Sequence, residues 1–136
     1  MSFLLDTNIL AELRKPRPHA GVTAWYGSVT GEDLFLSVLV VGEIQQGIVR
    51  LQRRDPRQAL AYETWLARLR RDFADRILAV TQDVALEWGR LNAGDPPPVV
   101  DGLMAATARV HGLTLVTRNV GDFVRTGVAV VNPFES

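Results

Sequence analysis

Four acidic residues stand in apolar or small-residue surroundings, where carboxylates are uncommon. Asp6 ends the run FLLD, and Glu43 lies in VLVVGEIQQG with no basic residue within one helical turn. Asp101 and Asp122 lie in PVVDGLMAA and TRNVGDF. Carboxylates that share a small space repel one another, so they stay ionised at neutral pH only beside a cation. If the fold brings the four together, they form a candidate site for a divalent metal ion.

The ligand chemistry of this site favours magnesium or manganese over zinc. Carboxylate oxygens are hard ligands that suit Mg²⁺ or Mn²⁺, and the chain has no cysteine. Its two histidines, His19 and His111, fall in an expected loop and at an expected helix end, without ligand spacing. Carboxylate-bound Mg²⁺ typically serves phosphate chemistry, in which one ion generates or orients a hydroxide and a second stabilises the leaving oxygen.

Each acid also has a purely structural interpretation. Asp6 is placed to cap the following helix, and Asp101 to complement a helix dipole, which is worth about 0.3–1 kcal/mol. Asp122 stands three residues after Asn119, as in a capping box. Glu43 is the hardest to explain in this way, because a buried and unpaired carboxylate is costly. The metal-site interpretation therefore depends on the convergence of all four.

Short apolar strands separated by helices are expected to position these acids. Strands are predicted at residues 2–6, 34–37, 76–80, 113–117 and 128–132. Helices are predicted at 7–15, 38–54, 56–73, 82–92 and 99–112, with a helical turn within 22–29 and a tight or single helical turn at 118–123.

This order of elements is typical of an α/β sandwich with a largely parallel sheet. Right-handed crossovers make each helix begin at the carboxyl edge of the sheet, where ligands of open α/β sheets also bind. All four acids are therefore expected near one edge. With 136 residues, the chain is long enough for a single domain over 1–136 and too short for two.

Composition restricts the remaining possibilities. Basic and acidic residues number 15 each, so net charge indicates no partner, although eight arginines gather between residues 50 and 76. They form either a solvated helical face or a contact for RNA phosphate or an acidic protein. No apolar stretch approaches the roughly 20 residues of a membrane span. The N-terminus has no basic segment of a signal peptide, so no membrane association and a cytoplasmic location are expected.

Four segments taken in order, LLDTNIL, LSVLVVGEIQQGI, VVDGLMAATARVHGLTLVTRNVGDF and VNPF, resemble the PIN-domain ribonucleases. More narrowly, they resemble the VapC-type toxins of bacterial toxin–antitoxin pairs. The resemblance covers nearly the whole chain, and the motifs in series are far more specific than DTN alone. It implies a three-layer PIN-like sandwich whose mainly parallel five-strand sheet is flanked by helices.

By motif, the resemblance assigns the family's catalytic acids to Asp6, Glu43, Asp101 and Asp122. Asp6 and Asp101 would hold the main Mg²⁺ or Mn²⁺ ion. Glu43 would assist directly or through water, and Asp122 would complete the site or hold a second ion. The resemblance also implies cleavage of RNA by activated water, leaving 5′-phosphate and 3′-hydroxyl ends.

Polar neighbours of these acids are candidates for orienting them. Thr7 and Asn119 are the main ones, with helix capping as an equal alternative, and Thr117 is a weaker candidate for a hydrogen bond to an acid. The resemblance further implies a homodimer and a cognate antitoxin that covers the active site. Trp25, Tyr26 and Trp65 are candidates for such an interface, although aromatic residues of amphipathic helices more often belong to the core.

Two other interpretations begin from the same first strand. A phosphatase of the aspartyl-phosphate type needs a second acid where Asn8 stands and a positioned lysine, yet Lys15 is the chain's one lysine. A phosphoryl-receiver domain needs an acidic pair after its first strand and a lysine late in the chain, and this sequence has neither. The stronger alternative is a PIN-like binding module that regulates transcription with a DNA-binding antitoxin and cleaves little. The sequence does not identify the RNA target.

Overall fold

The computed structural model describes residues 1–135 and contains one five-stranded sheet in the order β3-β2-β1-β4-β5. All four strand pairings are parallel, as expected. The strands are β1 (Phe3–Leu5), β2 (Leu34–Ser37), β3 (Ile77–Leu78), β4 (Thr114–Val116) and β5 (Val130–Val131). The two edge strands, β3 and β5, are shorter than predicted, which limits the unpaired backbone that a sheet edge exposes.

The predicted helices are present, with small shifts at their ends. They are α1 (Thr7–Arg14), α2 (Ala20–Gly27), α3 (Val38–Arg54), α4 (Pro56–Asp72), α5 (Gln82–Leu91) and α6 (Val99–His111). Single 3₁₀ turns form at Gly31–Asp33 (η1), Val120–Asp122 (η2), Val124–Thr126 (η3) and Pro133–Glu135 (η4). Of these four turns the sequence predicted η2 alone, and it placed the start of α2 two residues too late.

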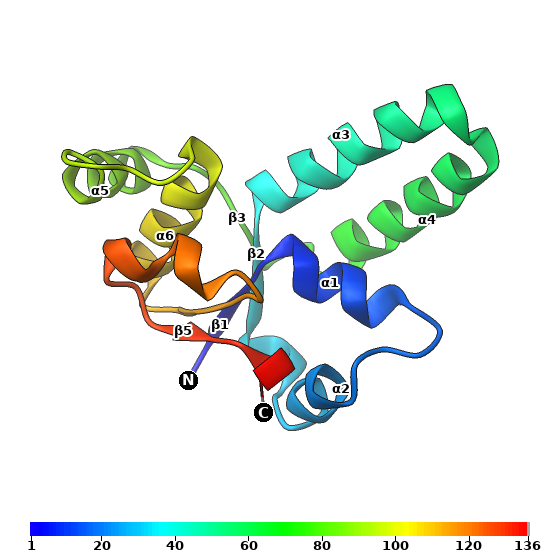
Figure 1. Ribbon diagram of the computed structural model, residues 1–136, viewed down its shortest axis with the longest axis horizontal. Helices are drawn as coiled ribbons and strands as arrows, with labels where there is room; N and C mark the ends of the chain where they lie inside the picture. Colours follow the sequence, from blue (N-terminus) through cyan, green and yellow to red (C-terminus); the bar gives the residue numbers. More distant parts are fainter. Residues whose placement is uncertain (136) are drawn as a thin grey trace.

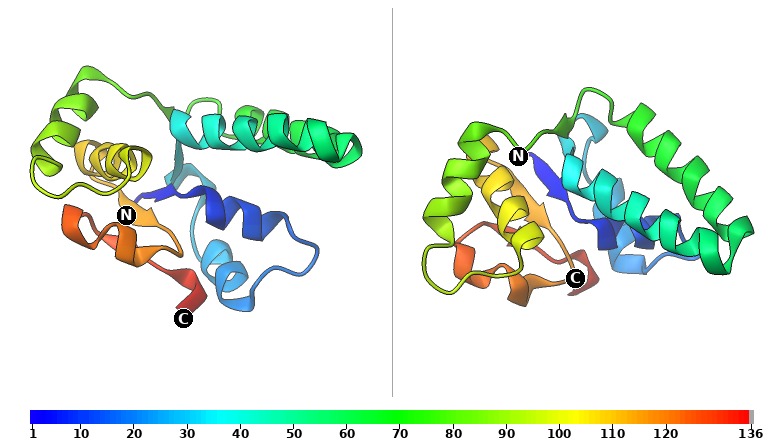
Figure 2. Two further views of the ribbon diagram at one scale, coloured as in Figure 1. Left: turned by 45° about the horizontal axis from the view of Figure 1, so that its top comes forward. Right: turned by 90° about the horizontal axis from the view of Figure 1, so that it is seen from above.

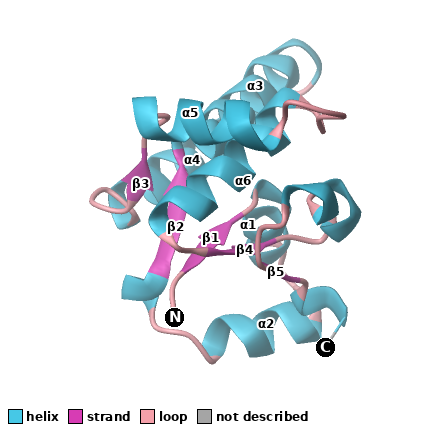
Figure 3. Cartoon of the chain, turned by 90° about the vertical axis from the view of Figure 1, so that its left-hand side faces the viewer, coloured by secondary structure: helices cyan, strands magenta, loops and turns pink. Residues whose placement is uncertain are grey.

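The helices divide into groups on either side of the sheet. α3 and α4 form a hairpin that projects beyond the strands, with α1 and α2 nearby, whereas α5 packs on α6 at the opposite end (Figures 1 and 2). The strands lie in the middle of the molecule with helices around them (Figure 3). Within residues 1–135, no helix is long and apolar enough to cross a membrane.

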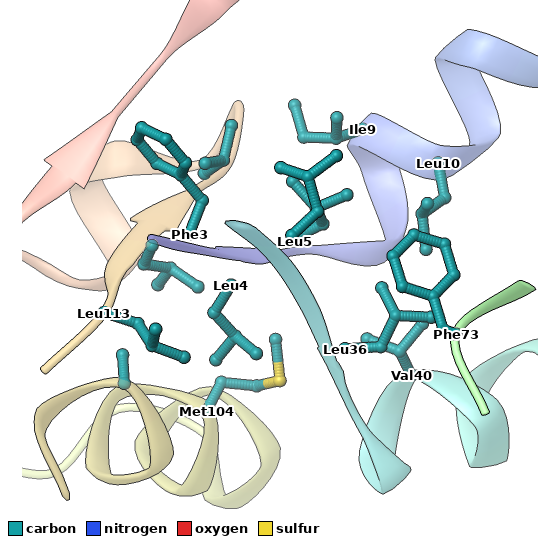
Figure 4. Packing of buried hydrophobic residues seen from close by; sticks show 14 of the residues in the cluster. Phe3, Leu4, Leu5, Ile9, Leu10, Leu36, Val40, Phe73, Met104 and Leu113 are labelled. Atoms are coloured by element: carbon teal, nitrogen blue, oxygen red, sulfur yellow. The ribbon is translucent and has the colours of Figure 1, made fainter. Parts of the chain in front are cut away.

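The central strand β1 shows why the fold is a three-layer sandwich. All three of its residues are buried, as expected for a strand covered on both faces. Leu4 points toward Met104 of α6, whereas Leu5 points to the other face, toward Ile9 of α1 (Figure 4). Each fully buried aliphatic side chain of this kind contributes about 1.5–3 kcal/mol, so β1 anchors both helical layers.

Helix caps fix where α3 begins and where α6 ends. The Ser37 hydroxyl accepts a hydrogen bond from the Leu39 backbone N–H at 3.0 Å, so α3 begins directly after β2. Gly112 ends α6 with a φ of 65°, a left-handed conformation that glycine adopts without steric cost. The carboxyl end of β2 is thereby connected rigidly to the helix that carries Glu43.

Candidate active site

Asp6 is both a helix cap and part of a site at the carboxyl edge of the sheet. Its backbone N–H donates to the Val116 carbonyl at 2.9 Å and so extends the pairing of β1 with β4. One carboxylate oxygen accepts from the Thr7 N–H at 2.8 Å, which caps α1. The other accepts from the Thr117 hydroxyl at 2.8 Å and from the Asn8 amide at 3.3 Å. The structural and functional interpretations of Asp6 are therefore compatible.

Glu43 reaches the same edge from the second turn of α3. The Thr7 hydroxyl donates to its Oε1 at 2.8 Å. The expectation that Glu43 is buried and unpaired is wrong, since its side chain is exposed and has this partner. Partial loss of solvation still raises its pKa; the Thr7 hydrogen bond lowers it and the charge of Asp6 raises it again, for a net increase.

Asp101 lies in the first turn of α6 and is half-buried. Loss of solvation, followed by the negative charges of Asp6, Asp122 and Glu43, raises its pKa to about 6. Because charges act strongly only over short distances, the four carboxylates share one electrostatic environment. The structure thus brings together the acids that the order of elements predicted at one edge, and we call them the acid cluster.

A close approach between α5 and α6 explains the glycine after Asp101. A Cβ atom on Gly102 would lie 3.1 Å from side-chain atoms of both Trp88 and Asn92 on the neighbouring helix segment. Such spacing is tighter than ordinary van der Waals contact, so a larger residue would require these two side chains to shift by a few tenths of an ångström. Gly102 therefore lets α5 pack against the turn that carries Asp101.

Asp122 joins the cluster from η2, just past the end of β4. Its backbone N–H donates to the Asn119 carbonyl at 3.1 Å, which closes the turn. The side chain of Asn119 makes no capping hydrogen bond there. The capping-box interpretation of Asp122 is consequently wrong, and its exposed carboxylate has no structural task in η2.

Polar neighbours hold two of the acids in place. Thr7 donates to Glu43, and the buried Thr117 donates to Asp6. Asn8 in the first turn of α1, which was not predicted as a site residue, links the residues that follow β1 and β4. Its amide donates to Asp6 and to the Thr117 hydroxyl at 3.2 Å, and its carbonyl oxygen accepts from the Arg118 N–H at 3.1 Å. The sequence feature that could have identified Asn8 as a site residue is its position in the DTN motif, two residues after Asp6.

The acid cluster has the donor chemistry of a divalent-metal site. None of the ion pairs in residues 1–135 includes any of its four carboxylates. Over the same residues, no three acidic, histidine or cysteine side chains are arranged so that they could hold a metal ion as they stand, so ion binding would require the carboxylates to draw together. A hard divalent cation would offset the repulsion that raises the pKa of Asp101, and carboxylate oxygens are the ligands that such an ion prefers. The residues present therefore fit a magnesium-like ion.

The two histidines are not part of the cluster. His19 caps α2, its Nδ1 accepting from the Gly21 N–H at 3.0 Å, and its ring packs against Phe134. His111 is the last residue of α6. The prediction that neither histidine joins this set of acids agrees with these positions.

Comparison with known proteins agrees with this architecture along the chain. The PIN domain family model matches residues 3–128. Toxin FitB of Neisseria gonorrhoeae is 35% identical over 136 residues, which cover 96% of this chain and 97% of that protein. VapC ribonuclease Y4jK of Sinorhizobium fredii is 30% identical over 137 residues, or 97% of each protein.

Solved structures of toxin–antitoxin proteins have the same fold as this chain. FitAB bound to an IR36 DNA fragment superposes with a TM-score of 0.87 at 33% identity, over 97% of this chain and 95% of that one. A toxin–antitoxin complex from Klebsiella pneumoniae superposes with a TM-score of 0.70 at 26% identity, over 97% and 98%. This chain therefore belongs to the PIN-domain family and, within it, to the VapC-type toxins.

Proposed function

We propose that this protein is a metal-dependent endoribonuclease and the toxin of a bacterial toxin–antitoxin pair, acting as a single nuclease domain in the cytoplasm. The observation that carries the proposal is the set of three further carboxylates around Asp101, none of them ion-paired in residues 1–135; burial, and after it the charges of these neighbours, raises the pKa of Asp101. Such an arrangement is costly unless it binds a cation, and strongly shifted acids gather at functional sites. The ribonuclease name of the Sinorhizobium relative supports RNA as the substrate.

In this proposal, Asp6 and Asp101 hold Mg²⁺ or Mn²⁺, with Glu43 and Asp122 completing the site. The bound ion supplies Lewis-acid chemistry that lowers the pKa of water and offsets phosphate charge. Thr117 and Asn8 fix the orientation of the Asp6 carboxylate, and Thr7 fixes that of Glu43. Carboxylates oriented in advance need little rearrangement during the reaction, which lowers its barrier.

The partners follow from the same relatives. The neighbouring structures are described as FitAB and as a toxin–antitoxin complex, so we propose a cognate antitoxin that silences this protein. We also propose a homodimer, the form that the family resemblance implies.

A second function is favoured by one observation. The FitAB structure contains DNA, so the chain would also act as a binding module that regulates transcription with a DNA-binding antitoxin. The two functions are compatible, because the acid cluster and a DNA-binding partner act on different molecules.

The decisive experiment uses the purified chain without antitoxin. It is incubated with total RNA and either Mg²⁺ or Mn²⁺, and the new 5′ ends are mapped. We expect cuts at a small set of positions that disappear when EDTA removes the metal. If no RNA is cut with either metal, the nuclease proposal fails and the binding-module function takes its place.

A further inference from the structure

A small pocket opens directly beside the acid cluster, between α1, α3 and α4. It has a volume of about 160 Å³, and Thr7 and Glu43 form the end nearest the acids. Gly47 lies along its side, and Tyr62 and Trp65 form the far end. We call this the aromatic pocket. Its position means that a group bound in it would touch the Glu43 side of the acid cluster.

The far end of the aromatic pocket combines aromatic rings with a guanidinium group. The rings of Tyr62 and Trp65 lie 5.7 Å apart between centroids, at an angle of 71°. The Arg14 guanidinium carbon lies 4.2 Å from the Tyr62 centroid and 5.5 Å from that of Trp65. These cation–π contacts hold the arginine at the pocket. An ordered cation and a half-buried indole ring are thus presented together.

Glu43 lines one end of this pocket, whereas the charge beside its far end suits an anion. Arg14 and Arg68 take part in none of the ion pairs within residues 1–135. Two wider hollows, of about 510 and 580 Å³, share Arg14 and Trp65 with the pocket, and both are also lined by Arg68. Asp72 is the acidic residue that lines the larger one. A hollowed surface with two uncompensated arginines therefore leads away from the acid cluster.

We propose that the aromatic pocket binds one base of a single-stranded RNA, in the nucleotide adjoining the phosphate that is cut. The base stacks on Trp65, and Arg14 contacts the next phosphate. This inference rests on the proposed nuclease function and adds to it a determinant of substrate selection. Thr7 and Arg14 lie seven residues apart on α1, which is about 10 Å along the helix axis, so the acid cluster and Arg14 contact neighbouring parts of one strand.

Physical chemistry favours RNA over a peptide in this pocket. Every base has a flat π-face, and its stacking on an aromatic side chain is tolerant of sequence. Proteins read single-stranded RNA by stacking unpaired bases on aromatic rings and arginine planes. The aromatic pocket offers both surfaces next to carboxylates that we propose act on a phosphodiester, so a nucleotide strand would engage all three features at once.

Gly47→Leu provides a variant that fills the pocket without altering the acid cluster. Apart from its own helix and chain neighbours, no heavy atom lies within 4 Å of a Cβ built on Gly47, so the new side chain extends into open space. Leucine also favours a helix more than glycine does. Gly89→Leu is the matched control, because Gly89 lies in α5, has the same open surroundings and is remote from the pocket.

The experiment measures kcat/KM on a short single-stranded RNA that contains one mapped cut. Gly47→Leu and Trp65→Leu should lower kcat/KM about 5- to 150-fold, the range for loss of one stacked base, while Gly89→Leu leaves it unchanged. Removing the base of the nucleotide beside the cut should cost the unmodified protein the same factor. Removal of this base should not lower the kcat/KM of Gly47→Leu any further, because that variant has already lost the stacking contact.

Each outcome separates this inference from the function on which it rests. If the protein cuts no RNA, the nuclease function and the base pocket both fail. If it cuts RNA but Gly47→Leu behaves like Gly89→Leu, the base pocket alone is refuted. If Gly47→Leu weakens antitoxin binding and leaves cleavage unchanged, the pocket belongs to the protein partner, which also overturns the proposal.

Discussion

Two groups of charged residues in this protein show opposite electrostatics. Glu87 on α5 accepts hydrogen bonds from Arg90 at 2.6 and 2.8 Å and from Arg109 on α6 at 2.9 Å. These guanidinium groups lower its pKa to about 2. Asp101 stands among carboxylates without an ion-pair partner in the described chain, and its pKa is raised to about 6. The pKa of a carboxyl group is thus lowered at Glu87 and raised at Asp101, although the two residues lie close together in the sequence.

The difference separates a structural role from a functional one. Glu87 fastens α5 to α6, and its charge is balanced within the fold. Glu12 follows the same rule, since hydrogen bonds from Lys15 and from the His19 N–H lower its pKa. The acid cluster is instead left unbalanced, and like charges gathered without a counter-charge are typical of sites where a ligand offsets them or function needs them.

Neutralising Asp101 and, separately, Glu87 should have the most different effects on RNA cleavage. Asp101→Asn keeps the shape of the side chain but removes a proposed metal ligand, so RNA cleavage should fall more than about 100-fold, beyond the 10- to 100-fold loss typical of groups that only support a ligand. Glu87→Gln should leave cleavage within a factor of about two. Cleavage rates on one mapped RNA, at saturating Mg²⁺ or Mn²⁺, provide the measurement.

Circular dichroism and melting curves of both variants serve as the control for folding. Equal losses of activity in the two variants would mean that the charges of α5 and α6 act through the fold alone. Cleavage retained by a folded Asp101→Asn would remove Asp101 from the site.

Removing a hydroxyl that orients the acid cluster should have the next largest effect. Thr117 is fully buried and donates to Asp6, and valine has nearly its shape without the donor. Thr117→Val should reduce metal affinity or cleavage about 10- to 100-fold, the cost of losing a group that orients a ligand. A metal titration of cleavage measures both quantities. Unchanged affinity and rate would show that Thr7 and Asn8 suffice to fix Asp6.

Much of this arrangement could be predicted from the sequence because it depends on the order of elements. Asp6 directly follows a strand, and Asp101 begins a helix that leads into the next one, so a parallel sheet brings both to its carboxyl edge. The five strands and five of the six helices were predictable because apolar periodicity is a local property, whereas α2 was predicted only as a helical turn within 22–29. The short turns η1, η3 and η4 contain no periodicity and were missed.

Contacts between distant segments were beyond this kind of prediction. The bond from Thr117 to Asp6 depends on the register that pairs Leu5 with Val116, and Glu87 meets Arg109 across 22 positions. Glu43 was predicted to be buried because it lies in the apolar segment VLVVGEIQQG. One residue turns a helix by about 100°, however, and this places Glu43 at an open pocket. Trp25, a candidate for an interface, instead packs against Phe3 at 5.2 Å.

A smaller effect should come from the stability of the metal-free protein. The pKa of Asp101 is about 6 in the folded chain, against 3.8 as its ordinary value. The folded state therefore binds more protons between these values, and stability falls as pH rises from about 4 to 6. Asp101→Asn lacks this titration, so in EDTA its melting temperature should exceed that of the unmodified protein at pH 7 by a few degrees.

This advantage should shrink toward pH 4, and saturating Mg²⁺ should reverse it, because the ion stabilises the folded state that binds it. Scanning calorimetry at several pH values, with and without the metal, tests both statements. A stability difference that stays constant with pH would contradict the raised pKa of Asp101, to which burial and then repulsion contribute.

Glu87→Gln should show the smallest effect and the opposite dependence on pH. The pKa of Glu87 is about 2 when folded, against an ordinary 4.5, so the unfolded state binds more protons between these values. The stability that Glu87 provides is present above pH 4.5 and is lost as pH falls toward 2. Its arginine partners are largely exposed, so solvent and salt screen the pairs. The melting temperature of Glu87→Gln should thus be slightly lower than that of the unmodified protein at pH 7 and low salt, with the difference vanishing near pH 2 or in 1 M salt. A difference that grows in high salt would show that packing of the Glu87 stem, and not its charge, joins α5 to α6.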